Sequence, residues 1–267
     1  MSSKSETSEQ FETLTVSADG RKGALTLNQP AKLNPLSVLA LTEIAAAARW
    51  FDSQSEVRVV VVTGAGRAFS AGADVSAFGE SEDIDPRDSA DTGRRMADAM
   101  EAMNAVTVAR INGAAVGGGL VLAAVCDLRI CVDDAYLSIP EIDLGIPLAW
   151  GGIPRLVREI GPALTKELVM TCRPFTPAEA MAAGFLNRVV PADRLDAEVD
   201  ELVETLITKP RHPLWLTKAS VNAVTEGMVG TRRHWSDADG LLMGLRDPEG
   251  RASAAAYLEK VKNRRKK

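Results

Sequence analysis

The chain has too few histidines and cysteines for the common metal and disulfide frameworks. Its 267 residues include only His212 and His234, which excludes a zinc site built from three His ligands. Its cysteines, Cys126, Cys131 and Cys172, form no Cys-x-x-Cys pair, and their odd number suits no closed disulfide framework. We therefore expect buried free thiols in a reducing compartment, and no metal site.

Long hydrophobic runs and an excess of positive charge are also missing. The longest apolar window, around residues 113–126, is shorter than the roughly 18 residues that a membrane span needs, and glycines interrupt it. The first ten residues, MSSKSETSEQ, are polar and lack the apolar core of a secretory signal. The net charge of −5 argues against a nucleic-acid surface. These absences predict a cytoplasmic globular protein with no membrane and no nucleic-acid partner.

The common nucleotide and hydrolase motifs are incomplete. The stretch TGAGRAFSAG follows a β-prone run, but Phe69 stands where the dinucleotide fingerprint G-x-G-x-x-G requires glycine, and no G-K-[ST] of a P-loop occurs. The pentapeptide AFSAG differs from the nucleophile elbow G-x-S-x-G only at Ala68. A serine hydrolase completed by His212 or His234 is the weaker alternative that this motif leaves open.

The apolar pattern alternates between strands and helices up to about residue 191 and is purely helical afterwards. Continuous apolar runs favour strands buried on both faces, and strands that alternate with helices favour a parallel α/β core. Strands are expected in a hairpin over 14–28 that turns at Ala18-Asp19-Gly20, and over 57–64, 105–113 and 128–132. Helices are expected over 35–52, with Pro35 in the first turn, and over 89–104, 194–208, 213–226, 230–246 and 248–267. We divide the chain into a disordered start (1–10), a core (11–191) and a C-terminal helical region (192–267).

Two glycine-containing turns share one plan. One buried strand leads into AFSAGADV, and the next leads into AAVGGGLV, where Gly117, Gly118 and Gly119 are consecutive. Three glycines are costly to order, so something must approach the backbone closely there. Unpaired N–H groups at such turns bind anions or developing negative charge. If the two strands are neighbours, one N–H from each turn can donate to the same oxygen and form an oxyanion hole from main chain.

Five stretches in this order resemble the enoyl-CoA hydratase/isomerase family, the crotonase superfamily. They are LNQPAKLNPLS, GAGRAFSAGADVSAF, INGAAVGGGLVLAAVCDLRI, LSIPEIDLGIPLAWGGIPRLVREIG and FTPAEAMAAGFLNRVV, and the resemblance runs from about residue 13 to 262. It implies an α/β fold, the crotonase-type spiral of ββα turns, with C-terminal helices that form a trimerisation region. Homotrimers, or dimers of trimers, are therefore expected. No cofactor is implied, because coenzyme A arrives as part of an acyl-CoA thioester substrate.

The resemblance also implies roles for individual residues. Backbone N–H groups of Ala73 and Gly118 would form the oxyanion hole for the thioester oxygen. Other substrate contacts are expected at Ala71, Asp74, Gly117, Val121 and Trp150, with Trp150 a candidate wall of the acyl pocket. Lys32 is a candidate contact to the adenosine end of coenzyme A, although the family's basic residue stands one position earlier, at Ala31 here. Lys218 and Lys260 resemble phosphate or adenine contacts, often supplied by a neighbouring subunit.

The reaction depends on a glutamate that is present and one that is absent. The resemblance implies that a hydratase of this family would carry two glutamates 20 residues apart. Glu141 of SIPEIDLG matches the second of them. Val121 stands at the first position. Two carboxylates can divide the work of activating water and protonating the α-carbon. Moving a double bond from C3 to C2 needs only one proton shuttle, so we predict an isomerase with Glu141 as its single catalytic residue and a raised pKa.

Other activities stay open at this point. A hydratase could pair Glu141 with water or with Asp143, which would point the same way in an extended segment but not in a turn. Asp74 and Asp127 are better explained as caps or structural hydrogen-bond partners. Ala149 disfavours the dienoyl-isomerase and dehalogenase branches of the family, which carry aspartate eight residues after the glutamate. A non-catalytic acyl-CoA binder is the rival from another class.

Overall fold

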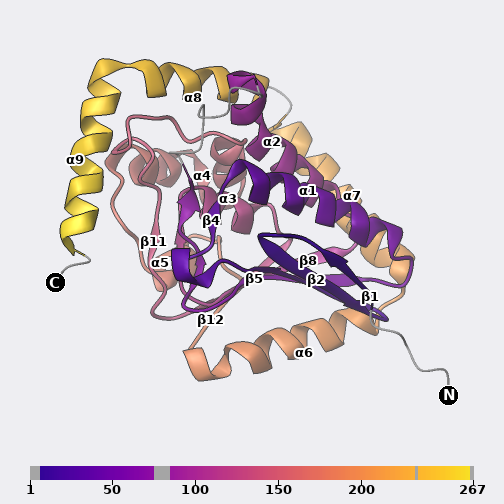
Figure 1. Cartoon of the computed structure of the whole chain (residues 1–267). Coiled ribbons are helices and arrows are strands. Elements are labelled where there is room, and N and C mark those ends of the chain that lie inside the picture. The colour runs from indigo at the N-terminus through magenta and orange to yellow at the C-terminus, as the bar shows by residue number, and fades with distance from the viewer. Residues whose placement is uncertain (1–6, 75–84, 232–233, 265–267) are drawn as a thin grey trace.

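A large, mostly parallel sheet runs through the computed structural model, which describes residues 7–74, 85–231 and 234–264 (Figure 1). Within these ranges the sheet has seven strands in the order β1-β2-β3-β5-β8-β10-β12. The first two pairings are antiparallel and the others are parallel. The strands are β1 (Thr7–Gln10), β2 (Leu14–Asp19), β3 (Lys22–Leu27), β5 (Val59–Gly64), β8 (Val106–Ile111), β10 (Leu128–Val132) and β12 (Arg188–Val190).

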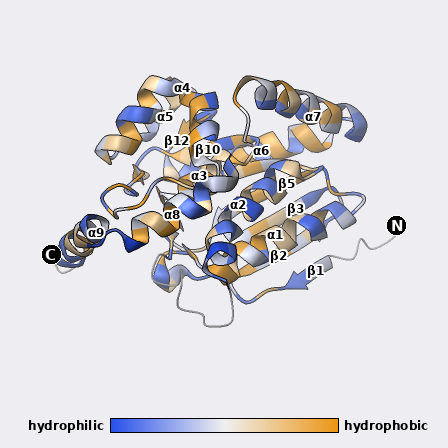
Figure 2. Ribbon diagram, turned by 90° about the horizontal axis from the view of Figure 1, so that it is seen from above, coloured by the Kyte–Doolittle hydropathy of each residue, from blue (hydrophilic) through white to orange (hydrophobic). Residues whose placement is uncertain are grey.

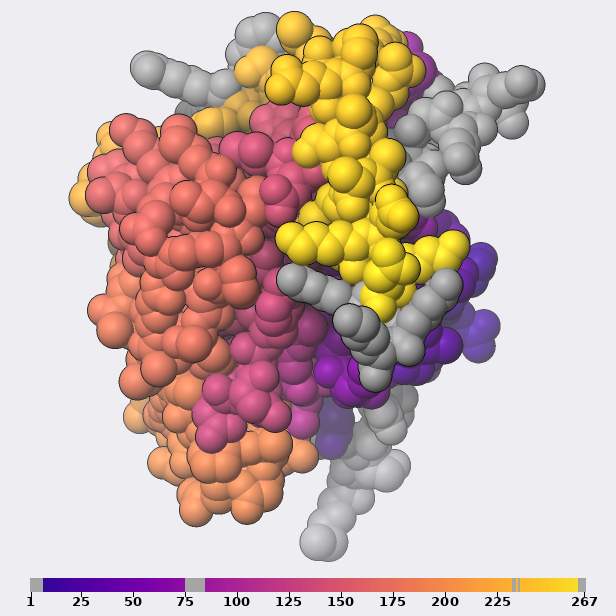
Figure 3. All heavy atoms as spheres, turned by 90° about the vertical axis from the view of Figure 1, so that its left-hand side faces the viewer, coloured from indigo at the N-terminus to yellow at the C-terminus, as the bar shows by residue number. Residues whose placement is uncertain are grey.

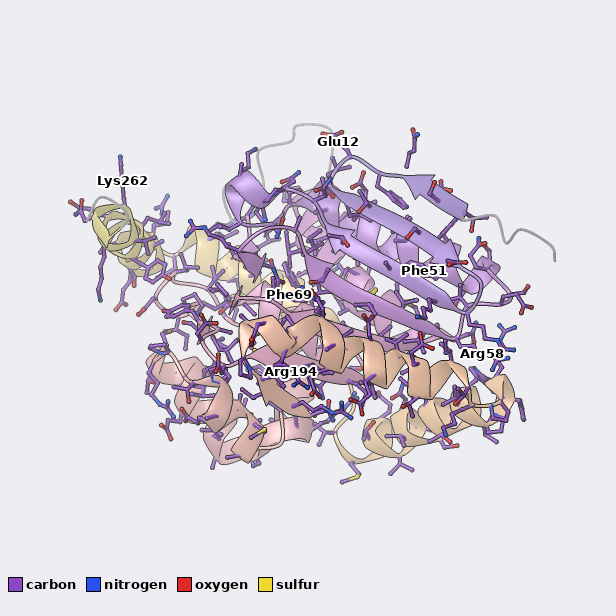
Figure 4. All side chains as sticks on the ribbon, turned by 90° about the horizontal axis from the view of Figure 1, so that it is seen from below. Glu12, Phe51, Arg58, Phe69, Arg194 and Lys262 are labelled. Carbon is purple, nitrogen blue, oxygen red and sulfur yellow. The ribbon has the colours of Figure 1, made fainter. Side chains whose placement is uncertain are left out.

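The central strands are apolar because helices cover both faces of the sheet. Strands β5, β8 and β10 are buried along most of their length. The helices α1 (Val38–Ser53) and α2 (Pro86–Ala102) pack against each other on one side, and α6 (Leu195–Ile207) lies along the other side. Arg58, at one end of the sheet, joins the end of α6 by donating from Nη1 to the carbonyls of Ile207 (3.1 Å) and Lys209 (2.6 Å) (Figure 4).

Short strands after each central strand generate the repeating ββα turns that the sequence predicts. A second sheet of the described residues, in the order β11-β9-β6, is made of β6 (Ala68–Ser70), β9 (Ala114–Val116) and β11 (Leu137–Ser138). These follow β5, β8 and β10 respectively, so the small sheet repeats the neighbour order of the large one. A further parallel pair joins β4 (Pro35–Leu36) to β7 (Gly72–Ala73). The turn after β9 opens directly into α3 (Gly118–Ala124).

Five further helices of the described residues pack around the sheet, and the last three of them belong to the expected C-terminal region. They are α4 (Gly152–Thr171), α5 (Pro177–Ala182), α7 (Arg211–Met228), α8 (Asp237–Arg246) and α9 (Pro248–Arg264). Seen from above, α4, α5 and α7 lie over one side of the molecule, and α9 projects beyond the body at the end away from the N-terminus (Figure 2). On the face in Figure 3, α9 forms a surface ridge. No helix of the described residues is long and apolar enough to cross a membrane.

Three local predictions need correction. The predicted disorder is wrong for residues 7–10, which form β1 by pairing with β2 from Thr7↔Ala18 to Gln10↔Thr15, whereas residues 1–6 lie outside the described ranges. Pro35 belongs to β4, and α1 begins after Ser37, whose hydroxyl accepts the Ala40 N–H at 3.2 Å. The helix predicted from residue 230 begins only at Asp237, after a short 3-10 turn at His234–Ser236. In the first two cases local backbone pairing or capping overrides the helix or coil preference of the segment.

Candidate active site

The two glycine-containing turns lie side by side. Strands β5 and β8 are parallel neighbours in register from Val59↔Val106, and β6 pairs with β9 through Ser70↔Ala115. Gly72, at a positive φ of 91°, marks the contact, since a Cβ there would lie 2.5 Å from the Val116 carbonyl oxygen and 3.6 Å from the Gly118 nitrogen. The turns therefore meet backbone to backbone, which is the arrangement that a shared oxyanion hole requires.

Gly118 and Ala73 occupy suitable positions for that role. Gly118 is the first residue of α3, so its N–H has no partner within the helix and lies at the positive end of the helix dipole. Ala73 ends β7, whose other residue is the Gly72 that contacts the second turn. Gly118 and Ala73 line the same small cavity. One cavity thus brings together the two residues whose N–H groups the family resemblance assigns to the oxyanion hole.

Glu141 reaches this cavity from the turn after β11. The turn is closed by hydrogen bonds from Leu144 N–H to the Pro140 carbonyl and from Ile146 N–H to the Glu141 carbonyl, both 3.0 Å. Glu141 is 7% exposed, and among the described residues its Oε2 has no hydrogen-bond partner. Burial raises the pKa of Glu141 from an ordinary 4.5 to about 7, although its own backbone N–H favours the charged form. A carboxyl group that titrates near neutrality can both accept and return a proton.

The cavity is small and, apart from Glu141, apolar. Its volume of about 20 Å³ suffices for roughly one water molecule. The two glycine-containing turns, the segment that begins at Glu141 and α8 contribute to the wall. The lining residues are Ala73, Gly118, Val121, Glu141, Ile146, Pro147, Leu148, Ala149, Trp150 and Leu241. Among these, Glu141 is the only titratable side chain. Val121, the position at which the family resemblance led us to look for a second glutamate, is buried.

Each glycine of the triplet is required by a different close neighbour. A Cβ on Gly117 would overlap Oε1 of Glu141, and a Cβ on Gly118 would overlap the Trp150 ring. A Cβ on Gly119 would lie 2.8 Å from the Ser70 carbonyl oxygen. The triplet therefore makes room for the carboxylate, for the indole and for the preceding turn.

The other predicted substrate contacts lie around this site or away from it. Ala71 and Asp74 flank β7 and are half-buried, with their N–H groups donating to the carbonyls of Leu33 (2.8 Å) and Leu36 (3.2 Å). Lys32 is exposed at the end of the 3-10 turn before β4. Lys260 is exposed near the end of α9. None of these four side chains is part of the cavity wall.

The structure places Lys218 in the interior, away from the cavity beside Glu141. It is the one buried residue of α7, and its ammonium lies 2.8 Å from Asp127 Oδ2 and donates to the Ala105 carbonyl at 2.9 Å. The same Asp127 oxygen accepts the N–H and hydroxyl of Thr107, which confirms Asp127 as a structural hydrogen-bond partner. A second cavity, of about 550 Å³, lies beside this ion pair under α7. It is larger than the cavity beside Glu141, but its lining includes neither glycine turn nor Glu141.

The structure does not support two alternatives from the sequence, a serine hydrolase at Ser70 and a hydratase in which Asp143 assists Glu141. Ser70 is fully buried, donates to the Asn34 carbonyl at 2.8 Å and has no histidine partner among the described residues, so the elbow-like AFSAG is no nucleophile site. His234 instead pairs with Asp237 at 3.1 Å. Asp143 is exposed because Glu141 begins a turn and not an extended segment, so the two side chains do not converge.

Sequence reasoning missed two residues. Leu241 lines the cavity, and Gly93 leaves room for the ring of Trp150, which a Cβ at residue 93 would overlap. Leu241 of α8 closes the cavity and clusters with Ala90 of α2 and Ile146. Arg87 of α2 holds α8 through an ion pair with Asp239, at 2.9 Å. No local signal marks Leu241, since it lies 100 residues from Glu141 in sequence. Gly93 did carry a signal, because glycine inside a helix is unfavourable unless a neighbour needs the space.

The match to a family model decides the chain's relationship to known proteins. Residues 23–266 match the model described as enoyl-CoA hydratase/isomerase. The chain belongs to the enoyl-CoA hydratase/isomerase family. The recognition made from the five sequence stretches is thereby confirmed.

Individual relatives agree with this assignment. A Mycobacterium bovis protein described as a probable enoyl-CoA hydratase is 34% identical over 85% of this chain and 90% of its own length. A Syntrophomonas wolfei protein named crotonyl-CoA hydratase is 32% identical over 94% of this chain and 97% of its own. The solved structure of an enoyl-CoA hydratase from Mycobacterium avium subsp. paratuberculosis superposes with a TM-score of 0.84 at 28% identity, over 92% of this chain and 99% of that one. The crotonase-type fold is confirmed.

Proposed function

We propose that this family member acts on enoyl-CoA thioesters in fatty-acid metabolism and shifts a 3-enoyl-CoA double bond to the 2-position. The observation that carries the proposal is the pairing of Glu141 with Val121 across one cavity. A single buried carboxyl faces the predicted oxyanion hole, and an apolar side chain occupies the place of the second acid. One carboxyl group is sufficient for a proton shuttle.

The first step removes a proton from C2 of the thioester. Ionised Glu141 accepts this proton, the C2–H electrons enter the conjugated system, and negative charge develops on the thioester oxygen. The N–H groups of Ala73 and Gly118 donate to that oxygen. In comparable reactions one such donor lowers the activation barrier by roughly 3 kcal/mol. The largely apolar wall lowers the local dielectric constant and so strengthens these interactions.

The second step returns the same proton to C4. Protonated Glu141 donates, the C4–H bond forms, and the double bond now joins C2 and C3, so atoms and charge balance without another reactant. The pKa of about 7 suits both halves, because the carboxyl is neither strongly acidic nor strongly basic at neutral pH. Val121 keeps this region free of a second charge.

Hydration of a 2-enoyl-CoA is the second candidate. The names of the relatives, which are described as hydratases, favour it, and the cavity beside Glu141 has room for about one water. Among the described lining residues, however, no second acid faces that water. Hydration would then need Glu141 to activate water and to supply the proton as well.

The deciding experiment offers a 3-enoyl-CoA and a 2-enoyl-CoA separately to the purified protein and to Glu141→Gln. We expect the 3-enoyl ester to be isomerised and the variant to lose at least about 100-fold in kcat, as general acid–base groups typically contribute. Hydration of the 2-enoyl ester at a comparable rate would instead establish the hydratase. Tight binding of both esters without turnover would show a non-catalytic acyl-CoA binder.

We also propose a homotrimer, or a dimer of trimers, assembled through the C-terminal helices. Apolar side chains exposed on α7, among them Leu216, Val224 and Met228, support a contact between subunits. Lys32 and Lys260 are exposed and remain our candidates for contacts to coenzyme A. Light scattering on the full chain tests the assembly, and a monomer at micromolar concentration would contradict it.

A further inference from the structure

The Trp150 indole is fixed between two glycines on different helices. On α2, a Cβ at Gly93 would overlap the pyrrole side of the ring at Nε1, Cε2 and Cδ2. On α3, a Cβ at Gly118 would overlap Cζ3 and lie 2.9 Å from Cη2 on the benzene side. Both helices therefore carry glycine where they contact this one ring. The ring touches Gly118, one of the two predicted oxyanion donors.

The backbone of Trp150 adopts a conformation that tryptophan rarely takes. Its φ is 61°, in the left-handed region, and Gly151 follows with φ 65°. Left-handed backbone costs a non-glycine residue about 1 kcal/mol or more. Neighbouring hydrogen bonds hold the segment in place, with Arg155 Nη1 donating to the Trp150 carbonyl at 3.0 Å and Gly151 N–H donating to Asp237 Oδ2 at 2.8 Å. The surrounding structure thus maintains an unfavourable backbone that directs the indole into the site.

The indole occupies space that an acyl chain would need. A thioester oxygen held by the Gly118 N–H places the first acyl carbons beside the ring that covers Gly118. Trp150 is 4% exposed, and the remaining cavity has about 20 Å³. Leu148 and Leu241 complete the wall around it. Among the described residues, the indole that two helices hold fills the space beside Gly118 into which a long chain would extend.

We propose that Trp150 is the specificity-determining residue of this enzyme and restricts its substrates to short-chain enoyl thioesters. This inference rests on the proposed function for its assignment of the ligand as an acyl-CoA. Gly93 is its positioning partner, since only glycine at that position of α2 leaves room for the ring.

The chain-length profile tests the proposal. We expect kcat/KM of the wild type to fall by at least about 100-fold between four- and eight-carbon enoyl-CoA esters, because each rejected methylene is worth about tenfold or more. Trp150→Ala should raise the eight-carbon value at least about tenfold relative to the four-carbon value. Trp150→Leu keeps an apolar side chain and provides a second variant should the alanine protein fail to fold. Trp215→Ala, at a 39% exposed position of α7, is the matched control and should keep the wild-type profile.

A second pair of variants tests the contact itself. Gly93→Ala should reduce turnover of the four-carbon ester, because the new methyl group displaces the indole toward the oxyanion hole. In the Trp150→Ala background the same change should have little effect, giving a non-additive cycle. Additive effects of the two changes would show that Gly93 does not position the ring.

Binding measurements separate this inference from the proposed reaction. Dissociation constants of the saturated butanoyl-CoA and decanoyl-CoA do not depend on turnover. Weaker binding of the longer ester, relieved in Trp150→Ala, would support the pocket even if neither enoyl ester reacts. Equal binding of both esters by wild type and variant would overturn the inference while leaving the isomerase proposal intact.

Discussion

The carboxylate of Glu141 lies against the backbone of Gly117, so closely that a Cβ at residue 117 would overlap Oε1. Gly117 has a φ of 51°, and its carbonyl accepts the Leu120 N–H at 2.8 Å in the first turn of α3. The residue that positions the helix start therefore also fixes the distance between the carboxylate and the Gly118 N–H. Gly117, which contacts the Glu141 carboxylate, is joined by one peptide bond to Gly118, the predicted oxyanion donor.

Gly117→Ala should therefore abolish activity. The methyl group would collide with Glu141 and would also be strained at positive φ. We expect a loss of at least about 100-fold in kcat/KM, since a displacement of about 1 Å in a reacting group has this effect. Gly227→Ala is the control, because a Cβ there meets nothing within 4 Å and should leave the rate unchanged. Retention of wild-type activity in Gly117→Ala would contradict the close approach of Glu141.

Glu141 should make stability and activity depend on pH in opposite directions. Its pKa is 4.5 ordinarily and about 7 in the folded chain, so the folded state binds the extra proton between these values. The destabilisation from this group is absent below pH 4.5, grows up to pH 7 and is constant above it, reaching about 3 kcal/mol. By contrast, kcat/KM should rise with pH to a plateau above about 7, because the ionised form accepts the proton from C2.

Glu141→Gln tests the stability half of this statement. The variant should unfold at higher denaturant concentration than the wild type at pH 8, and the difference should disappear near pH 4. Parallel urea titrations at several pH values measure it. A variant less stable than the wild type at pH 8 would show that ionised Glu141 is stabilised by a partner, against the burial that raises its pKa.

The sequence predicted the parts of this site that depend on local backbone chemistry. Residue type and spacing predicted the glycine turns, the buried strands and Glu141. The resemblance to the family predicted the pairing of Ala73 with Gly118. The packing partners were not predictable in this way. Leu241 lines the cavity and Gly93 contacts Trp150 only because α8 and α2 fold onto this region. Lys218 was predicted to contact coenzyme A, but the structure buries its ammonium in an ion pair with Asp127. Long-range burial decided these cases, and a sequence pattern carries little information on it.

Val121→Glu should move the activity toward hydration. Val121 and Glu141 line the same cavity, so the new carboxyl would give water a second acid–base partner. We expect hydration of a 2-enoyl-CoA to rise by about 100-fold relative to isomerisation of the 3-enoyl ester. Two carboxyls in one apolar cavity should also raise each other's pKa and lower stability. Val121→Gln matches the size without the charge, and an equal gain in that variant would refute the role of the second carboxyl.

Replacing Lys218 should affect folding and not the affinity for coenzyme A. The Lys218 ammonium and Asp127 carboxylate form a largely buried pair that ties α7 to the start of β8. Removing one partner of such a pair typically costs about 3 kcal/mol, because the other charge stays buried. We expect Lys218→Met to lower the free energy of unfolding by that amount with an unchanged KM for acyl-CoA. Lys260→Met, at an exposed position of α9, should show the reverse, with normal stability and a raised KM. A raised KM with normal stability in Lys218→Met would instead place Lys218 at the coenzyme A site.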